Sequence, residues 1–305
     1  MSPIIAPQFT KATGQTFSCP GKVFLLGEYA VLAGTPAWVA TVEPRFEFQF
    51  GIGEAIDKLF HPKSPASGLL TASNFPLGTF KDPFAGRGGL GASTAQFALI
   101  FHAIQNAPSS WREALLSYRK LTAHEALPPS GADLVAQWVG GIVRFDPSAL
   151  TVKQLYDCPL DWDRILVFSA TEQPNRKVTT YQHLEKLKNF SKIHAALIRE
   201  LRLLLQRADA ATQAGVNTEF GNLLTLYGDL LAKNGLELAA TSKDRAVLST
   251  LPGVTGIKGT GALQADGIII HLDPQHSDRA QIIAHARDRK LFLISNGLKN
   301  HKGVT

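Results

Sequence analysis

Residues 86–97 read GRGGLGASTAQF, and four of the first six are glycine. Closely spaced glycines let the backbone turn tightly and direct its N–H groups at an anion. A helix is expected to begin near Ala92, because apolar residues recur at helical spacing from Phe97 to Ile104. The positive end of the helix dipole would attract the anion to the same position. The stretch therefore predicts a phosphate-binding loop that opens a helix.

Ser93 and Thr94 follow this loop and bring hydroxyl groups that would contact a phosphate or its magnesium ion. Three of the glycines also spell GxGxxG, the dinucleotide-binding pattern. The preceding residues, 74–85, contain prolines and make no buried strand, so the context that this pattern requires is missing. A Walker A sequence is absent, and residues 91–95 only approximate a nucleophile elbow. An ordinary loop before a helix stays open as the alternative.

Two further segments each contain a charged residue that could have either a structural or a catalytic role. Lys22 begins the apolar part of PGKVFLLGEYAVLAGTPA (20–37), and for this segment alone an edge lysine of a sheet is the favoured interpretation. Asp133 lies within PPSGADLVAQWVGG (128–141), where Ser130 three residues before an acid is typical of a capping box. A carboxylate at a helix start is kept ionised by the helix dipole, which would also suit a catalytic base.

The remaining pattern predicts strands before helices in both halves of the chain, without strict alternation, and therefore an α+β fold class. A connection rich in Pro and Asp precedes residue 164, so we expect a domain boundary near residue 160. A turn at 259–262 looks like an ordinary loop. The predicted strands cover 16–19, 22–29, 45–52, 141–145, 164–169, 267–272 and 291–295, and the predicted helices cover 92–107, 110–127, 178–187, 192–211, 219–235 and a segment from 130.

The composition excludes several classes of protein. Of the 305 residues, 45% are hydrophobic and 18% are charged, which excludes wholesale disorder. Two cysteines far apart in sequence make neither a disulfide framework nor a four-ligand zinc site. No apolar run reaches the roughly 18 residues of a membrane helix. No secretory signal precedes residue 16, so we expect a cytoplasmic protein with no membrane partner. The net charge of +6 suits anionic small molecules as well as nucleic acid.

Taken in order, four segments resemble the motifs of the GHMP kinase family, named for galactokinase, homoserine, mevalonate and phosphomevalonate kinases. Residues 20–37 are similar to the first motif, and GGLGAST (88–94) resembles the phosphate-binding loop. PSGAD (129–133) resembles the segment with the catalytic aspartate of mevalonate kinases. IKGTGALQADGIII (257–270) is similar to the third, glycine-rich motif. Within the family, the segments GEYAVL and PSGAD most resemble the motifs of the mevalonate and phosphomevalonate kinase branch.

The resemblance implies a two-domain kinase. Residues 1–160 would form an ATP-binding domain like domain 2 of ribosomal protein S5, and residues 161–305 a ferredoxin-like GHMP kinase domain. ATP, Mg²⁺ and a small-molecule acceptor would meet between them, in a monomer or homodimer. The implied activity is that of a transferase of the isoprenoid precursor pathway.

The resemblance also assigns roles by position. Lys22 would lower the pKa of the acceptor hydroxyl, and Asp133 would accept its proton. Ser93 and Glu125 would bind the metal, with Glu113 a distant second to Glu125. The nucleotide phosphates would contact Gly88, Gly89, Leu90, Gly91, Ala92, Ser93 and Thr94. The substrate would contact Glu28, Tyr29, Arg176, Lys177, Gly261 and Ala262.

Two departures from the family pattern are visible. Glu125 lies closer to PSGAD than the family's metal-binding glutamate does, so its assignment requires a shortened loop. Leu263 and Gln264 stand where the family has a glycine run. Their side chains would enter the space where backbone approaches the ligands, unless the site is reshaped.

The acceptor is predicted as mevalonate, with phosphomevalonate as the alternative. A hydroxyl needs a base, so the presence of both Lys22 and Asp133 favours mevalonate. Tyr29, Asp266 and the phrase ADLVAQWVGG resemble phosphomevalonate kinase instead, and Arg176 and Lys177 would bind an acceptor phosphate.

Two hypotheses from other classes remain. An inactive metabolite sensor is motivated by the altered third motif. A nucleic-acid-binding protein is motivated by the net charge. However, the basic residues of 176–207 alternate with Leu and Ile at helical spacing, which indicates the solvent-facing side of an amphipathic helix. We therefore expect no nucleic-acid partner.

Overall fold

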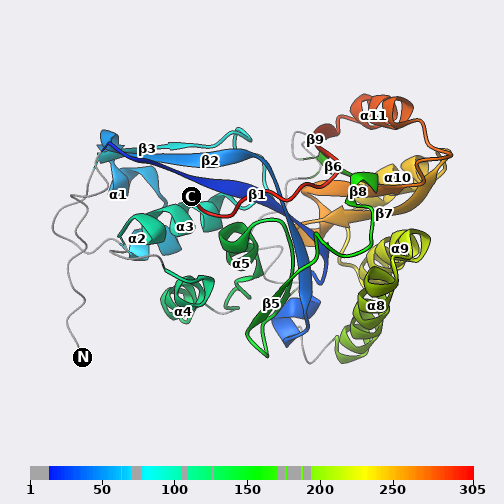
Figure 1. The fold of residues 1–305 in the computed structure, drawn as a ribbon, viewed down its shortest axis with the longest axis horizontal. Coiled ribbons are helices and arrows are strands. Elements are labelled where there is room, and N and C mark those ends of the chain that lie inside the picture. The colour runs from blue at the N-terminus through cyan, green and yellow to red at the C-terminus, as the bar shows by residue number, and fades with distance from the viewer. Residues whose placement is uncertain are drawn as a thin grey trace.

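The protein has two antiparallel sheets, each covered by helices (Figure 1). The computed structural model describes residues 14–62, 64–69, 77–104, 109–125, 127–170, 176, 187 and 194–305. The predicted helix over 178–187 lies outside this description, apart from Leu187. The α+β class expected from the sequence is confirmed.

The first sheet has the strand order β1-β2-β4-β5, and β3 pairs with β2. Its strands are β1 (Thr16–Leu26), β2 (Ala37–Ala55), β3 (Leu77–Lys81), β4 (Ile142–Asp146) and β5 (Thr151–Gln154). β1 is continuous where the sequence predicted two strands, and it ends before Gly27, whose φ is 101°. A side chain at Gly27 would overlap the backbone of Ala37, so glycine is required at this turn. β3 was not predicted from the sequence.

Helices cover one face of this sheet. They are α1 (Ile56–Leu59), α2 (Pro65–Gly68), α3 (Ala92–Ile104), α4 (Trp111–Thr122) and α5 (Ala132–Val139). The aromatic side chains of Phe46, Phe48 and Phe50 alternate along β2 and are buried in one core with Phe97 of α3. This alternation is the period-two pattern that predicted the strand.

The second sheet has the order β7-β8-β6-β9, with every neighbouring pair antiparallel. Counted along the chain, this is the order second, third, first, fourth of a ferredoxin-like domain. Its strands are β6 (Ile165–Ser169), β7 (Val254–Thr260), β8 (Gly267–Leu272) and β9 (Phe292–Asn296). Its helices are α8 (Ala195–Ala214), α9 (Asn217–Lys233), α10 (Ala239–Leu248) and α11 (Arg279–Asp288).

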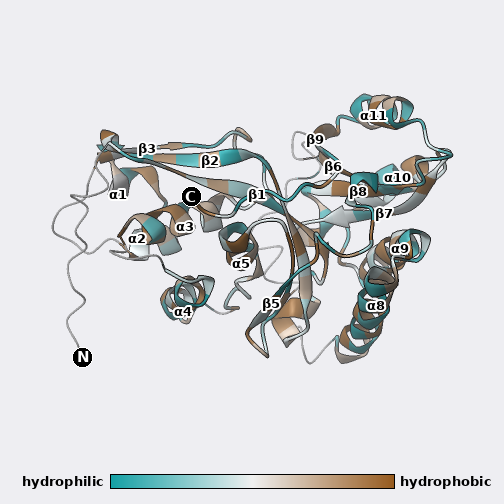
Figure 2. Ribbon diagram, viewed as in Figure 1, coloured by the Kyte–Doolittle hydropathy of each residue, from teal (hydrophilic) through white to brown (hydrophobic). Residues whose placement is uncertain are grey.

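Helix α8 is amphipathic, as its sequence predicted, and it carries hydrophilic and hydrophobic residues along its length (Figure 2). Leu201 and Leu205 are buried in the core, whereas Arg199, Arg202 and Arg207 are exposed. The basic residues of this helix therefore form a solvated face. The helices α10 and α11 and the strand β7, part of which looked like a loop, were not predicted from the sequence.

The last residues of the chain return to the first sheet (Figure 1). The Ser18 N–H donates to the Thr305 carbonyl at 2.8 Å, and the Thr305 N–H donates to the Ser18 carbonyl at 3.0 Å. Arg45 of β2 donates to the Lys302 carbonyl at 2.8 Å. A division of the chain at residue 160 stays a prediction, because residues 301–305 hydrogen-bond to the first sheet and to the turn before β4, whereas Leu298 and Lys299 contact Trp162 and Asp163.

One buried histidine lies within the second sheet and joins two of its strands, β8 and β7. The His271 side chain, on β8, is 1% exposed, and its Nδ1 lies 2.6 Å from Thr255 Oγ1. Its Nε2 has no hydrogen-bond partner within the described residues. Burial lowers the pKa of His271 to about 4, and Arg164 adds to this effect.

We expect this histidine to make the fold sensitive to acid. Below pH 6.5 the unfolded chain takes up a proton at His271, whereas the folded chain does so only near pH 4. The free energy of unfolding should therefore fall by up to about 3 kcal/mol as the pH drops across this window. Urea unfolding between pH 4.5 and 7 measures the slope, and His271→Gln should flatten it. An unchanged slope in that variant would contradict the assignment.

Candidate functional site

A cavity of about 330 Å³ lies where the first sheet, its helices and the β7–β8 connection meet. Most of the residues that line it come from the sequence motifs. They are Lys22, Phe24, Glu28, Tyr29, Val31, Leu32, Thr94, Tyr118, Leu127, Pro129, Ser130, Gly131, Asp133, Leu187, Gly261, Ala262 and Asp266. Seven of the predicted site residues are thus brought together: Lys22, Glu28, Tyr29, Thr94, Asp133, Gly261 and Ala262.

Lys22 and Asp133 form an ion pair at this cavity. Lys22 Nζ lies 2.9 Å from Asp133 Oδ2, and the side chains are 7% and 30% exposed. β1 is an edge strand in the sheet order, yet Lys22 is buried and faces α5 rather than solvent. Lys22 Nζ also lies 5.3 Å from the centre of the Phe24 ring. The interpretation of Lys22 as a solvated edge lysine is therefore wrong.

The start of α5 presents Asp133 to Lys22. The residue that caps this helix is Gly131, in the left-handed conformation at φ 81°, and no side chain completes the cap. Ser130 Oγ accepts a hydrogen bond from the Ala132 N–H at 3.2 Å. The capping box that the sequence permits between Ser130 and Asp133 does not form, so the Asp133 carboxylate is available to the cavity.

The glycine-rich loop is held directly against β1. The Lys22 N–H donates to the Leu90 carbonyl at 3.0 Å. Gly91 has a φ of 89°, and a Cβ there would lie 2.8 Å from Lys22 Cγ and 2.9 Å from Gln137 Nε2. Leu90 is buried in the core, Ser93 is exposed, and Thr94 alone of the predicted loop residues 88–94 lines the cavity.

Asp266, at the end of the β7–β8 connection, lines the cavity. The sequence analysis noted it only as a similarity to phosphomevalonate kinase and gave it no role in the site. Its Oδ2 accepts a hydrogen bond from the Ala262 N–H at 3.1 Å. A side chain at Gly89 or Gly261 would overlap Asp266, so this carboxylate separates the two glycine turns. Burial raises the pKa of Asp266, Lys22 opposes this, and Asp133 adds to it.

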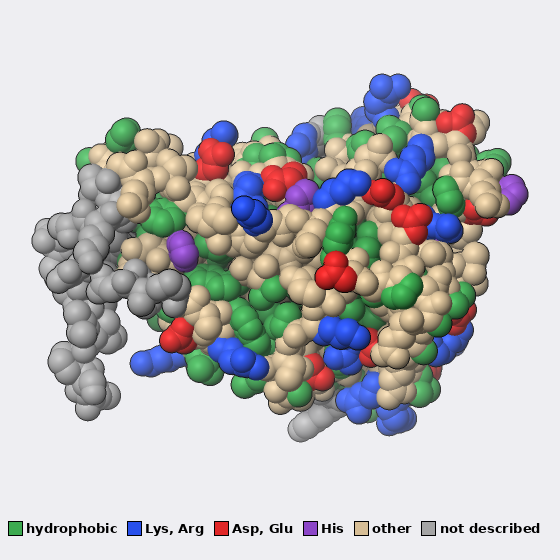
Figure 3. Space-filling view, viewed as in Figure 1, with side chains coloured by type: hydrophobic (Ala, Val, Ile, Leu, Met, Phe, Trp, Pro, Cys, Tyr) green, Lys and Arg blue, Asp and Glu red, His purple; other side chains and the backbone are tan. Residues whose placement is uncertain are grey.

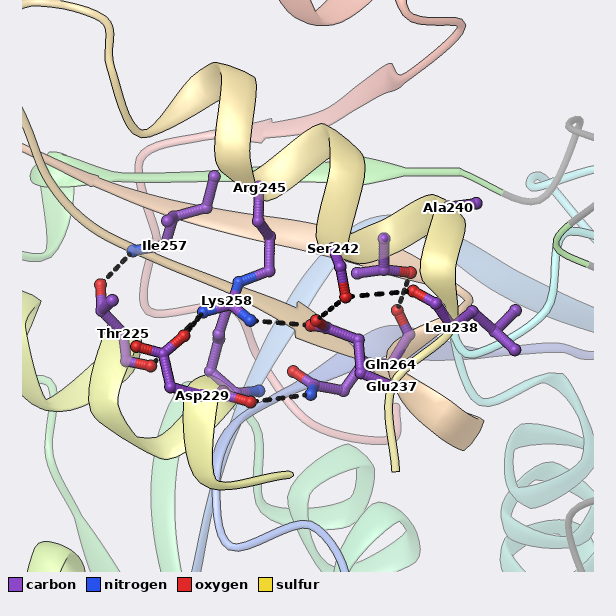
Figure 4. Close-up of polar contacts among 12 residues, drawn as sticks. Thr225, Asp229, Glu237, Leu238, Ala240, Ser242, Arg245, Ile257, Lys258 and Gln264 are labelled. Atoms are coloured by element: carbon purple, nitrogen blue, oxygen red, sulfur yellow. Dashed lines mark hydrogen bonds and ion pairs between the residues drawn. The ribbon is translucent and has the colours of Figure 1, made fainter. Parts of the chain in front are cut away.

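Leu263 and Gln264 do not enter the cavity. Both adopt left-handed backbone conformations, with φ of 50° and 51°. Leu263 is buried in the hydrophobic core, and Gln264 Nε2 donates to the Gly228 carbonyl at 3.3 Å. Gln264 lies among the polar contacts of α9, α10 and β7 (Figure 4). These side chains therefore do not obstruct the cavity, because the connection has a backbone conformation typical of glycine and both side chains are buried in the protein.

Glu28 and Tyr29 line the cavity from the segment after β1. Glu28 Oε1 pairs with the buried Lys258 of β7, whereas Glu28 Oε2 has no hydrogen-bond partner in the described part of the chain. The Tyr29 hydroxyl accepts a hydrogen bond from the Leu263 N–H at 2.6 Å. The first and third motifs are thus connected directly.

Several other predicted residues are not brought to the cavity. Arg176 is buried, pairs with Asp244 and donates to Thr241 Oγ1 at 3.0 Å, so its guanidinium is held within the second half. Lys177 lies outside the described residues. Glu125 is exposed just beyond α4 and does not line the cavity. Glu113 instead caps α4, where its Oε2 accepts from the Ser110 N–H at 2.6 Å.

The cavity offers oxygen atoms to a hard cation. In the described residues, no group of three or more His, Cys, Asp and Glu side chains is arranged to hold a metal by itself. Mg²⁺ is usually bound through one or two carboxylates together with substrate phosphates. Asp133 and Asp266, with the Thr94 hydroxyl, are a donor set that fits Mg²⁺ arriving with a nucleotide. None of the helices described is long and apolar enough to cross a membrane.

Substitution of Gly91 should disrupt the loop. Gly91→Ala adds a methyl group against Lys22 and Gln137, whereas Gly86→Ala, also at positive φ, adds one with no atom within 4 Å. Both variants carry backbone strain of about 1 kcal/mol, but only the first also has the overlap. We expect Gly91→Ala to weaken binding of a non-hydrolysable ATP analogue at least about ten-fold more than Gly86→Ala, as measured by calorimetry. Equal affinities for the two variants would contradict this account of the loop.

Comparison with known proteins identifies the fold. No sequence-family model and no curated protein sequence matches the chain. Three solved structures illustrate the structural similarity. Methanococcus jannaschii mevalonate kinase superposes with a TM-score of 0.67 at 14% identity, covering 93% of this chain and 98% of that one. Streptococcus pneumoniae phosphomevalonate kinase, in complex with phosphomevalonate and AMPPNP, gives 0.69 at 14% identity, covering 92% and 98%.

The third is Lactococcus lactis galactokinase complexed with galactose, with a TM-score of 0.72 at 13% identity, covering 99% of this chain and 98% of that one. The three structures are kinases with different acceptors, and each matches this chain over nearly its full length. The resemblance found in the sequence motifs is therefore confirmed at the level of architecture: this chain has the fold of the GHMP kinases.

Proposed function

We propose that this chain is an ATP-dependent kinase that transfers the γ-phosphoryl group to a hydroxyl of a small molecule. The observation that carries this proposal is the ion pair between Lys22 and Asp133, at 2.9 Å on the wall of the cavity. The glycine-rich loop lies directly beside it, through the bond from Lys22 to Leu90. A base, a cation and an anion-binding loop are the parts that phosphorylation of an alcohol requires.

The residues would divide the work as follows. The acceptor oxygen forms a bond to the γ-phosphorus while the bond from that phosphorus to the leaving ADP oxygen breaks. Asp133 takes the proton of the acceptor hydroxyl, which is otherwise almost wholly protonated at neutral pH. Lys22 stabilises the negative charge that develops on the acceptor oxygen. Mg²⁺, when bound, neutralises charge on the phosphates of ATP.

The charge of the cavity favours an alcohol over a phosphate as acceptor. Among the described lining residues, Lys22 is the only Lys or Arg, whereas Glu28, Asp133 and Asp266 contribute carboxyl groups. A phosphorylated acceptor brings two more negative charges and would need further cations. Arg176, the described member of the predicted phosphate-binding pair, is engaged with Asp244. Mevalonate is therefore the acceptor that we propose, with phosphomevalonate as the alternative.

Neither of the other two hypotheses is favoured by an observation. The sensor hypothesis was motivated by the altered third motif, and Leu263 and Gln264 of that motif do not line the cavity. A nucleic-acid surface would gather basic residues on one face. On the face in Figure 3, Lys and Arg side chains are interspersed with Asp and Glu.

The acceptor is tested by measuring ADP release with Mg·ATP against mevalonate, 5-phosphomevalonate, mevalonate 3-phosphate, homoserine and galactose. We expect turnover on mevalonate, because an ion pair of lysine and aspartate suits an acceptor that must lose a hydroxyl proton. Turnover on 5-phosphomevalonate alone would show that the alternative acceptor, phosphomevalonate, is the correct one. ATP binding without turnover on any acceptor would count against the kinase proposal.

The catalytic pair is tested by Lys22→Met and Asp133→Asn. Each should lower kcat by about 10² to 10⁴-fold, because Asp133→Asn removes the base and Lys22→Met removes the cation that stabilises the acceptor oxygen. Lys81→Met is a matched control, since Lys81 pairs with Glu47 at 3.1 Å on the exposed side of the same sheet. Thermal unfolding should show that all three variants fold. Near-full turnover in either cavity variant would refute the role of that residue.

A further inference from the structure

Thr94 occupies a special position among the residues of the glycine-rich loop and the helix it opens. It lies in the first turn of α3, its side chain is 7% exposed, and it lines the cavity with Lys22 and Asp133. Ser93, which the sequence resemblance assigns to the metal, is exposed and does not line the cavity. The two neighbouring hydroxyl groups therefore differ in what they can contact.

The hydrogen bonds of Thr94 involve Gln137, a fully buried residue of α5. Gln137 Nε2 donates to the Pro20 carbonyl at 2.8 Å and to the Gly91 carbonyl at 3.2 Å. Backbone carbonyls only accept, so the amide NH₂ must face them and the amide oxygen must face the other way. That oxygen, Gln137 Oε1, contacts Thr94 Oγ1.

This orientation fixes the direction of the Thr94 hydroxyl. Thr94 Oγ1 has two protein partners, Gln137 Oε1 and the Gly91 carbonyl at 3.1 Å, and both of them accept. A hydroxyl has one hydrogen and two lone pairs. Because the hydrogen is used inside the protein, only lone pairs remain for a further partner of this cavity-lining residue. The oxygen of Thr94 cannot donate to a phosphate, whose oxygens at neutral pH mostly accept.

We propose that Thr94 is an oxygen ligand of the divalent cation that accompanies the nucleotide, and that Gln137 is the positioning residue that orients it. This inference rests on the proposed function, because the cation arrives with ATP. A neutral oxygen that offers lone pairs is a ligand that Mg²⁺ accepts, and Asp133 and Asp266 supply anionic oxygens in the same cavity. The inference assigns to Thr94 the metal-binding role that the sequence resemblance gave to Ser93.

The test is the affinity of Mn²⁺ for the full chain in the presence of AMPPNP, measured by electron paramagnetic resonance. Thr94→Val keeps the shape of the side chain and removes the oxygen, and should weaken Mn²⁺ binding by about ten- to a hundred-fold. Thr94→Ser keeps the oxygen and should restore the affinity to within a few-fold. Ser93→Ala, measured in parallel, should have the smaller effect.

Three results would overturn the inference. Mn²⁺ affinity could be unchanged in Thr94→Val, or lost in Ser93→Ala instead. A raised KM for the acceptor with unchanged Mn²⁺ affinity would mean that the lone pairs of Thr94 accept from the acceptor substrate. If the unmodified chain binds neither AMPPNP nor Mn²⁺ with it, the proposed function itself fails, which the wild-type measurement shows before any variant is made.

The role of Gln137 is tested by a double-mutant cycle. Gln137→Met should lower Mn²⁺ affinity in the unmodified chain and have a clearly smaller effect in Thr94→Val, because the positioned oxygen is already absent there and only the bonds to Pro20 and Gly91 remain to be lost. Additive losses would indicate a merely structural role and overturn this part of the proposal.

If Thr94→Val does not fold, Thr94→Cys provides a second measurement. A thiolate ligand prefers Cd²⁺ to Mg²⁺, so Cd²⁺ should bind this variant with AMPPNP more tightly than it binds the unmodified chain. Equal Cd²⁺ affinities would contradict the inference.

Discussion

The arrangement of the site depends on a buried ion pair between the two sheets. Lys258 of β7 is fully buried and pairs with Glu28, which follows β1. Burial lowers the pKa of Lys258, and Glu28 opposes this by favouring the charged form. Removing one partner of a buried pair leaves an uncompensated charge, which costs about 3–5 kcal/mol. Neighbouring hydrogen bonds hold the same segment, since the Tyr227 hydroxyl donates to the Glu28 carbonyl at 2.8 Å. The third motif is therefore held opposite the first, and the cavity lies between them.

A second organising contact is the Gln137 carboxamide. It reaches Pro20 of β1, Gly91 in the loop and Thr94 in α3. Three segments of the chain thus meet at one buried side chain, on the helix that also carries Asp133. Residues four apart lie on the same face of a helix. The spacing of Asp133 and Gln137 therefore lets one helix present a carboxylate to the cavity and a carboxamide to the structure behind it.

Local patterns predicted much of this site. The glycine-rich loop and the α3 helix were predicted from their own local patterns. Lys22 and Asp133 were selected only through the resemblance of their segments to family motifs, because their local patterns also allowed an edge lysine and a helix cap. Long-range pairs were not found. Nothing in the local sequence relates Lys258 to Glu28, or Arg176 to Asp244, and the assignment of Arg176 to an acceptor phosphate followed from that gap.

β7 was missed for a different reason. Its sequence, VTGIKGT, resembles a flexible connection because glycine weakens a strand pattern. In the structure β7 packs against α9 so closely that a side chain at Gly256 would overlap the backbone of Gly221. Glycine here permits close approach between two elements rather than a turn, and sequence alone does not separate these two uses.

In the third motif, by contrast, residues other than glycine adopt a backbone conformation that is typical of glycine. Leu263 and Gln264 carry a conformational penalty of about 1 kcal/mol each at positive φ, where glycine has none. The Tyr29 hydroxyl binds the Leu263 N–H, and Thr241 Oγ1 donates to the Gln264 carbonyl at 2.9 Å, so the strained turn is held from both sides. Glycine would adopt this backbone conformation without the penalty. Here Leu263 and Gln264 adopt it with side chains buried in the protein, and Asp266 lies beside the turn. The turn therefore leaves the cavity open, and the carboxyl group of Asp266 is part of the cavity wall.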